Sequence, residues 1–197
     1  MNIHPLTLTG RWVRLEPLAL SHVPELCQVG LDEDIWRFMP YGTIGSPEAM
    51  RGWVEEMLRR ASRGTDLPFA IVWRETGKAI GATRYMTISH PDRNLEIGGT
   101  WLGKAHQRTA ANTEGKYLLL RHAFEALGCV RVQFRTDVRN TRSQAALERL
   151  GAVREGVLRK ITVLPDGHQR DSVFYSILDA EWSAVKARLE GLMEKYK

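Results

Sequence analysis

The feature that most constrains the fold is a strand–turn–helix–strand pattern in the middle of the chain. The segment LEIGGTWL, residues 95–102, is typical of a buried strand, and CVRVQFRTDV, residues 129–138, alternates apolar and polar side chains as a half-buried strand does. Between them a polar turn, residues 103–112, leads into an amphipathic helix, residues 113–128. Two strands joined through a helix usually lie parallel in one sheet, so the pattern predicts a β-α-β unit.

The remaining segments predict an α/β fold of the α+β or mixed type, a mostly antiparallel sheet covered by helices. Ser46 followed by Pro47 marks a helix start, and apolar side chains then recur at helical spacing as far as Ala61. Ser21 and Asp179 are expected to cap the first and the last helix. Further strands are expected at residues 11–18, 68–75, 78–88, 155–164 and 169–178, and further helices at residues 22–31 and 140–151, the latter closed by Gly151.

Composition bounds the class of protein. The chain has 197 residues, of which 43% are hydrophobic, and shows no linker or internal repeat, so residues 1–197 are expected to form one domain. No stretch is long and apolar enough to cross a bilayer, and the N-terminus lacks the pattern of a secretory signal. Two cysteines, Cys27 and Cys129, make no disulfide framework, which fits a reducing cytoplasm.

The positive charge is concentrated in one part of the chain. Residues 101–170 carry 13 Lys and Arg against 6 Asp and Glu, a net charge of +7, whereas the other residues sum to −2. A local positive field attracts nucleic acid, a membrane surface or a polyanionic cofactor, and charge alone does not choose among them.

The polar turn before the central helix is a candidate anion site. The first N–H groups of a helix have no partner within it, and together with the helix dipole they hold an anion such as a pyrophosphate. Lys104, Arg108 and Lys116 lie in or beside the turn and are expected to neutralise phosphate charge. The alternative is a helix start that needs only a cap, which one of Thr109, Asn112 and Thr113 would supply.

Four stretches resemble one known family. They are RLEPL at residues 14–18, EIGGTWLGKAHQ at 96–107, NTEGKYLLLRHAFEALG at 112–128 and NTRSQAALERLGAVREGVLR at 140–159. From about Arg11 to Leu178 the chain resembles the GNAT superfamily of acyl-CoA-dependent N-acetyltransferases, and within it the RimJ/RimL-like branch. The resemblance implies a GNAT-like fold with a splayed strand pair, acetyl-CoA as the acyl donor, an amine as the acceptor, and no metal.

The resemblance also implies where the coenzyme binds. The family's phosphate turn reads Q/R-x-x-G-x-G/A, and aligning it at Gln107 places Ala110 and Asn112 at the small positions. Arg108 stands where this branch commonly has glycine, so it either contacts phosphate through its charge or is a solvated surface side chain. The pantetheine arm is expected in the splay beside Gly98 and Gly99. The residues expected to bind coenzyme are Trp101, Leu102, Gln107, Arg108, Thr109, Ala110, Ala111, Asn112, Thr113, Asn140 and Arg142. Three of them have an alternative role. Trp101 would pack in the core, Asn140 would be a helix N-cap, and the Arg142 side chain would lie in solvent.

Two catalytic residues follow from the same resemblance. An alkyl amine has a pKa near ~10.4 and must lose a proton before it attacks, and Glu96 is the candidate base, acting through water. The alternative for Glu96 is a structural strand carboxylate. Leu147 occupies the position of the family's tyrosine acid, so Ser143 is expected to offer its hydroxyl to the departing thiolate. Arg139 and Arg142 flank the helix start and are candidates for the adenosine phosphates.

The acceptor is the open question. Its pocket is expected around residues 36–41 and the last hairpin, and relatives acetylate protein N-termini or small amines such as antibiotics, amino acids and polyamines. Other readings are a non-catalytic acyl-CoA-binding module and a nucleic-acid binder, although no DNA- or RNA-binding motif is present. A homodimer is an option because relatives often pair. The histidines lack zinc-site spacing, no G-x-S-x-G motif indicates a hydrolase, and Cys129 is expected in the core.

Overall fold

The computed structural model describes residues 1–196, and all of its strands belong to one eight-stranded sheet in the order β1-β2-β3-β4-β5-β6-β8-β7. Every neighbouring pair is antiparallel except β5 and β6, which are parallel. This confirms the expected mixed α/β fold and the β-α-β unit. The strands are β1 Leu8–Thr9, β2 Val13–Pro17, β3 Leu67–Trp73, β4 Lys78–Ser89, β5 Asn94–Leu102, β6 Arg131–Asp137, β7 Val153–Val163 and β8 Gln169–Leu178. The α-helices are α1 Val23–Gly30, α2 Glu33–Trp36, α3 Pro47–Ser62, α4 Ala110–Arg121, α5 Thr141–Leu150 and α6 Trp182–Glu194.

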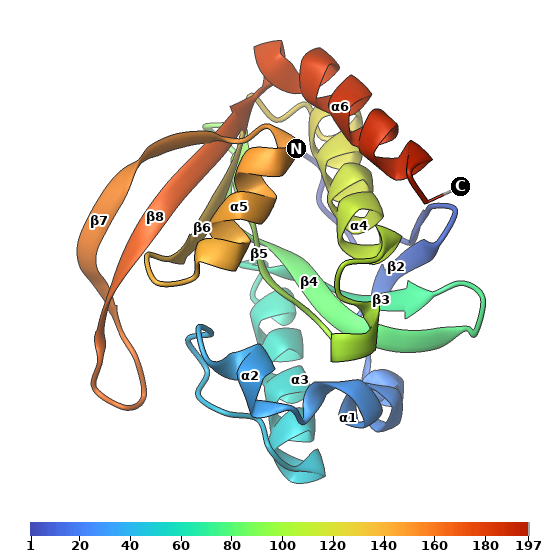
Figure 1. Cartoon of the computed structure of the whole chain (residues 1–197), viewed down its shortest axis with the longest axis vertical. Coiled ribbons are helices and arrows are strands. Elements are labelled where there is room, and N and C mark those ends of the chain that lie inside the picture. Colours follow the sequence, from blue (N-terminus) through green and yellow to red (C-terminus); the bar gives the residue numbers. More distant parts are fainter. Residues whose placement is uncertain (197) are drawn as a thin grey trace.

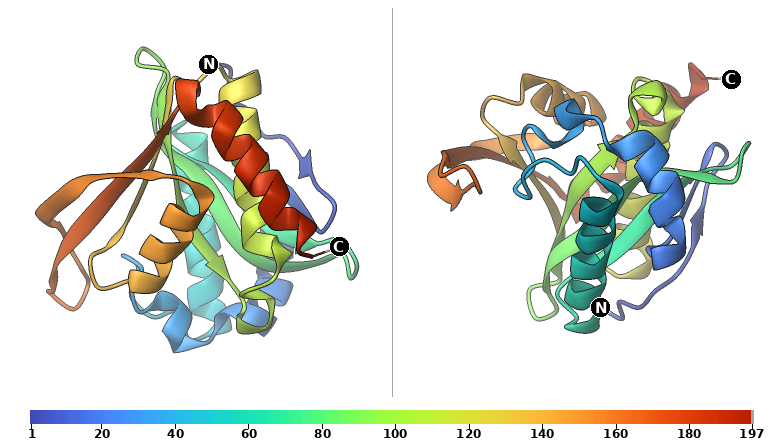
Figure 2. Two further views of the ribbon diagram at one scale, coloured as in Figure 1. Left: turned by 45° about the horizontal axis from the view of Figure 1, so that its top comes forward. Right: turned by 90° about the horizontal axis from the view of Figure 1, so that it is seen from below.

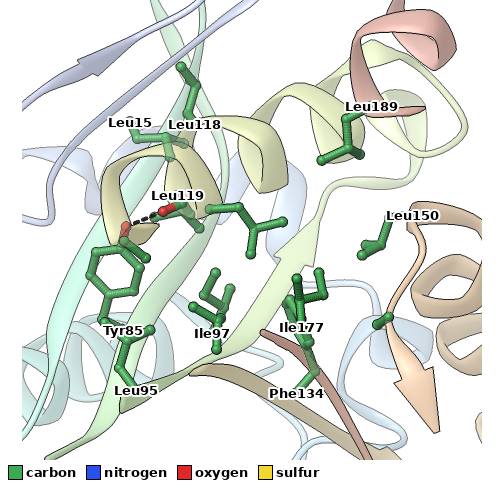
Figure 3. Close-up of a cluster of buried hydrophobic side chains, with 14 of the residues drawn as sticks. Leu15, Tyr85, Leu95, Ile97, Leu118, Leu119, Phe134, Leu150, Ile177 and Leu189 are labelled. Atoms are coloured by element: carbon green, nitrogen blue, oxygen red, sulfur yellow. Dashed lines mark hydrogen bonds between the residues drawn. The ribbon is translucent and has the colours of Figure 1, made fainter. Parts of the chain in front are cut away.

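The helices cover the two faces of the sheet. Helices α1, α2 and α3 lie together at one end of the molecule, and α4 and α6 lie side by side on the other face (Figures 1 and 2). The core is therefore divided into two clusters. The cluster under α4 contains Leu118, Leu119 and Leu189 with strand residues such as Ile97 and Phe134, and there the Tyr85 hydroxyl donates to the Leu119 carbonyl at 2.6 Å (Figure 3). The second cluster lies between the sheet and helices α1 and α3.

Helix α4 begins earlier than its sequence pattern indicates. Its N-cap is Thr109, whose hydroxyl accepts the N–H of Ala111 at 3.2 Å. Of the three caps considered, Thr109 is the one used, because its extended backbone places the hydroxyl over the first turn. The turn therefore ends at Thr109 instead of Asn112, and residues 110–112 are helical. At its other end the helix continues as a π-helical stretch, His122–Ala126.

Two of the other expected helix boundaries are confirmed and two are corrected. Ser46 caps α3 by accepting the N–H of Ala49 at 3.1 Å, and Gly151 ends α5 with a φ of 106°. Ser21 and Asp179 do not cap the helices as expected. Each lies in a 3-10 turn, Leu20–His22 or Asp179–Glu181, that precedes α1 or α6, so the chain already curves helically where a side-chain cap would act.

Strands β5 and β6 separate after three residue pairs. The pairs are Asn94–Arg131, Leu95–Val132 and Glu96–Gln133. Beyond them β5 stays with β4 as far as Leu102, and β6 stays with β8 as far as Asp137. This confirms the splayed strand pair.

A bulge lies in β5 within the splayed part. Opposite it, Ala82 pairs with Trp101 and Arg84 pairs with Gly98, so Gly99 and Thr100 together oppose one residue of β4. Gly99 has a φ of 58°, a conformation that glycine adopts without strain. The extra residue reverses the alternation of the strand, and Trp101 consequently joins the α1–α3 cluster.

A buried carboxylate ties α4 to the first part of the sheet. The Glu114 side chain accepts three backbone N–H groups, from Arg11 at 2.5 Å, Trp12 at 2.7 Å and Val13 at 2.7 Å. These amides lie at the start of β2, about a hundred residues away in sequence. One side chain therefore satisfies three donors that would otherwise lack partners.

Among residues 1–196, no helix has the length and apolar character needed to span a membrane.

We expect Glu114→Ala to lower the free energy of unfolding by about 3 kcal/mol, because three backbone amides, one buried and two part-buried, lose a charged acceptor. Denaturant unfolding measures this change. The control is Glu55→Ala, which removes an exposed glutamate of α3 paired with Arg51 and is expected to change stability by less than about 0.5 kcal/mol. Equal losses in the two variants would contradict this account of Glu114.

Candidate active site

A cleft of about 610 Å³ opens where β5 and β6 diverge. Its walls come from β5, the loop after α2, the turn before α4, helix α5 and strands β6 and β8. Most residues expected to act on or bind the coenzyme line it: Glu96, Trp101, Leu102, Gln107, Arg108, Thr109, Asn112, Asn140, Arg142 and Ser143. Ala110, Ala111 and Thr113 do not line it, because they are buried in the first turn of α4. Only their backbone groups remain candidates for contact with a ligand.

The turn before α4 keeps a glycine-like backbone without a glycine. Arg108 has a φ of 62°, in the left-handed region where a side chain costs roughly 1–2 kcal/mol. Its side chain is exposed at the cleft. Gln107 holds the turn in place, since its amide donates to the Leu102 carbonyl at 2.9 Å and accepts from Arg142 at 2.6 Å. The turn thus has a defined shape and presents a cation at the α4 N-terminus.

The other two cations expected at the turn have different surroundings. Lys104 lies 3.3 Å from Asp32 and 3.8 Å from Asp34, at the start of α2. Lys116 is inside the protein, because it lies in the second turn of α4 and that face packs on the sheet. The sequence interpretation placed Lys116 at the turn as a phosphate cation, and the structure corrects this.

The buried amine of Lys116 forms the floor of the cleft. It is 7% exposed, donates to the Thr100 hydroxyl at 2.7 Å and lies 5.8 Å from the centre of the Phe134 ring. None of the ion pairs within residues 1–196 includes it. Burial lowers the pKa of Lys116 to about 7. The Thr100 hydroxyl in turn bonds to Thr83 at 2.7 Å, so the β5 bulge and α4 are connected through polar side chains.

Glu96 lies where the two strands part. It is buried, and its oxygens accept from Arg135 Nε at 3.0 Å and from Gln133 Nε2 at 3.1 Å. Both donors belong to β6. The carboxylate therefore has the structural contacts that the alternative reading requires, while it also lines the cleft as the catalytic reading requires.

Helix α5 supplies the opposite wall. Asn140 caps it, with its side-chain oxygen accepting the Ser143 N–H at 3.0 Å, so the capping alternative holds for Asn140. The Ser143 hydroxyl makes no hydrogen bond within residues 1–196 and lines the cleft. Leu147, at the tyrosine position, is buried. Arg139 is engaged elsewhere, since it holds the buried Asp137 through two hydrogen bonds of 2.9 and 2.7 Å.

The β5 wall ends in a group of aromatic rings. Trp101 packs on Trp36 and Trp53 with ring centres 5.1 and 5.8 Å apart, which confirms the core-packing alternative for Trp101. Leu102 is buried in the α4 cluster. Both residues still border the cleft.

One buried cleft residue, Arg84, was missed by the sequence interpretation, whereas Arg170 belongs to the last hairpin, which was expected at the acceptor pocket. Arg84 of β4 is 3% exposed, and its Nε lies 2.8 Å from an oxygen of Asp66. Arg170 donates to the Phe38 carbonyl at 3.1 Å and lies 3.8 Å from Asp137. An arginine in a strand normally faces solvent, so only the tertiary packing identifies these two as buried.

Comparison with known proteins identifies the family. Residues 13–153 match the family described as Acetyltransferase (GNAT) domain. The chain belongs to the GNAT acetyltransferases. This confirms that the protein is an acetyltransferase, as the sequence resemblance implied.

Individual GNAT relatives agree with this assignment. The Bacillus subtilis (strain 168) protein YdaF, whose name provisionally assigns it as a ribosomal N-acetyltransferase, is 32% identical over 110 residues, 56% of this chain and 59% of YdaF. The match thus spans less than two thirds of YdaF, and the name supports the RimJ/RimL-like branch. A crystal structure from T. thermophilus, provisionally described as an acetyltransferase, has 45% identity and a TM-score of 0.89 over 98% of this chain and all of that one.

A coenzyme-bound structure shares the fold. Mycobacterium smegmatis RimJ in complex with CoA-disulfide superposes with a TM-score of 0.80 at 22% identity, covering 95% of each chain. Within residues 1–196 no group of His, Cys, Asp and Glu side chains is arranged to hold a metal ion.

We expect Lys116→Met to change the pH dependence of stability. The pKa of Lys116 is about 7 in the folded protein and near ~10.4 when unfolded, so between these values the unfolded state binds one proton more. The free-energy cost of burying the charged Lys116 amine is complete below pH 7 and disappears as the pH rises and the amine loses its proton. The stability of the wild type relative to the variant should rise by about 2 kcal/mol between about pH 6.5 and about pH 9.

Denaturant unfolding at both pH values measures this difference. Lys78→Met, which alters an exposed lysine at the start of β4, serves as the control and should give a difference independent of pH. A Lys116→Met difference that is equally flat would contradict the buried, unpaired amine.

Proposed function

We propose that this GNAT enzyme transfers the acetyl group of acetyl-CoA to the α-amine of a protein N-terminus by direct attack in a ternary complex. The observation that carries the proposal is the cleft between β5 and β6, which is lined by the turn before α4, by β5, and by α2 and the loop after it. Two relatives support it by their names: YdaF for a ribosomal acceptor and RimJ for CoA.

The residues of the cleft fit the parts of acetyl-CoA. Arg108 and the free N–H groups at the start of α4 suit the pyrophosphate, and Arg142 is close enough to Gln107 to add a second cation. The unpaired edge of β5 beyond Glu96 offers backbone groups to the amides of the pantetheine arm. Asn140 and Ser143 face the same cleft from α5.

The chemistry follows from this placement. The neutral acceptor amine attacks the thioester carbonyl, the carbon–sulfur bond breaks, and CoA departs as a thiolate that takes up a proton. Glu96 receives the amine proton through water, with Arg135 and Gln133 holding the carboxylate in orientation. The Ser143 hydroxyl, which has no other partner among residues 1–196, donates a hydrogen bond to the departing sulfur.

The second candidate function is acetylation of a small-molecule amine such as an antibiotic, an amino acid or a polyamine. The enclosed acceptor end of the cleft, with Tyr41, Arg84 and the buried Arg170, favours it over a wide peptide groove. The cytoplasmic location and the homodimer remain predictions.

Coenzyme binding is tested first by calorimetry with acetyl-CoA. Arg108→Ala should weaken binding about tenfold at low salt and less at higher salt, where charge is screened. Alanine and arginine share the same left-handed strain, so this variant isolates the charge. Arg63→Ala, at the exposed end of α3, is the matched control. No binding by the wild type would refute acetyl-CoA as donor, and unchanged affinity and salt dependence in Arg108→Ala would refute the role of that side chain.

The acceptor and the base are tested by turnover. Short peptides with free N-termini and a panel of free amines separate the two candidate acceptors, and we expect the peptides to be the better substrates. With the better acceptor, Glu96→Gln should lower kcat by about a hundredfold. If Glu96→Gln loses stability but keeps its kcat, Glu96 is structural only.

A further inference from the structure

Tyr41 lines the cleft, and its hydroxyl has no acceptor for its proton among residues 1–196. Tyr41 belongs to the loop between α2 and α3, and its oxygen is covered although it lines the cleft. Within residues 1–196 that oxygen has no hydrogen bond of normal geometry. The guanidinium of Arg84, which lies over the Tyr41 ring, can only donate. The phenol proton is therefore free for an acceptor that enters the cleft.

Arg84 and Tyr41 converge on the bulge of β5. A methyl group placed on Gly99 would lie 3.2 Å from the Tyr41 oxygen and 3.3 Å from Arg84 Nη1. Arg84 forms an ion pair with Asp66, with 2.8 Å between Arg84 Nε and Asp66 Oδ2. The guanidinium carbon of Arg84 is 5.5 Å from the centre of the Tyr41 ring. Burial raises the pKa of Tyr41, with the charge of Arg84 opposing, so the phenol is protonated at neutral pH. The pair is a fixed donor backed by a fixed positive charge.

The bulge is also where the acyl end of the coenzyme arrives, if the proposed function holds. The pantetheine arm spans roughly 16 Å, about the length of five extended residues. With the pyrophosphate at the turn that begins at Gly103, five residue steps back along β5 lead to Gly98. The thioester then lies next to Gly98 and Gly99, within reach of Tyr41.

We propose that the Tyr41 hydroxyl donates a hydrogen bond to the carbonyl oxygen of the acetyl thioester. This inference rests on the proposed use of acetyl-CoA. When the amine attacks, that oxygen gains negative charge, and a preorganised donor with Arg84 behind it stabilises the charge. The phenol keeps its proton throughout, so its role is distinct from that of Ser143 at the sulfur. Tyr41 reaches the cleft from the loop after α2, whereas Leu147, where the family's tyrosine is missing, lies on α5.

The test is the selectivity between acetyl-CoA and CoA, which differ in the carbonyl. Calorimetry on Tyr41→Phe should show acetyl-CoA binding about fivefold weaker than in the wild type and CoA binding unchanged, because only the carbonyl loses a donor. Tyr117→Phe, whose hydroxyl bonds to Glu190 at 2.8 Å away from the cleft, is the matched control and should change neither affinity. With an active acceptor, Tyr41→Phe should lower kcat about tenfold or more and leave the acceptor KM unchanged.

The outcomes separate this inference from the function on which it rests. If the wild type binds neither ligand, coenzyme use itself is wrong and the role of Tyr41 with it. If Tyr41→Phe leaves both affinities unchanged, or weakens acetyl-CoA and CoA equally, the proposed function stands and the carbonyl contact is wrong. A rise in acceptor KM alone would place Tyr41 on the acceptor and would likewise overturn the inference.

Discussion

The hydrogen bonds between Glu96 and β6 join β5 and β6 at the position where the two strands separate, and the rest of the site depends on that separation. Glu96 and Gln133 form the last parallel pair of β5 and β6, and the Glu96 carboxylate binds both Gln133 and Arg135 across the strands. An ionised carboxylate is tolerated inside a protein only when its oxygens have such partners. These bonds join the two strands at the last residue before they separate. The splayed part of β5, which lines the cleft, lies beyond this junction.

Opening a sheet between two strands leaves backbone groups and apolar side chains without their usual neighbours, and the chain compensates on both sides. On the α4 side Lys116 forms the floor of the gap and donates a hydrogen bond to Thr100 at the bulge. On the other side the tryptophan cluster and the Arg84–Asp66 pair support β5 and β4. Side-chain contacts therefore support the floor of the cleft and one of its walls, and a site needs such support to hold a ligand in a single position.

Much of this arrangement follows from local sequence patterns. The alternation in residues 129–138, the helical spacing after Pro47 and the glycine at 151 each predicted an element that the structure contains. The splay and the place of the coenzyme turn came from the family resemblance. The start of α4 at Ala110 was predicted three residues late, because Thr109, Asn112 and Thr113 are all competent caps and only the backbone conformation chooses. The 3-10 turns at Ser21 and Asp179 were missed for the same reason.

What the sequence determined by itself is therefore most of the elements, their order and the positively charged segment around the α4 N-terminus, since hydrophobic period, turn residues and charge act between near neighbours. The short elements β1 and α2 were not predicted. Only the tertiary structure decided what each polar side chain does. Lys116 reads as a turn cation but is buried, because α4 presents that face to the sheet. Tyr41 and Arg84 meet over Gly99 because a single inserted residue shifts β5 by one position. Such contacts join different elements of the fold, and no local pattern encodes the distance between them.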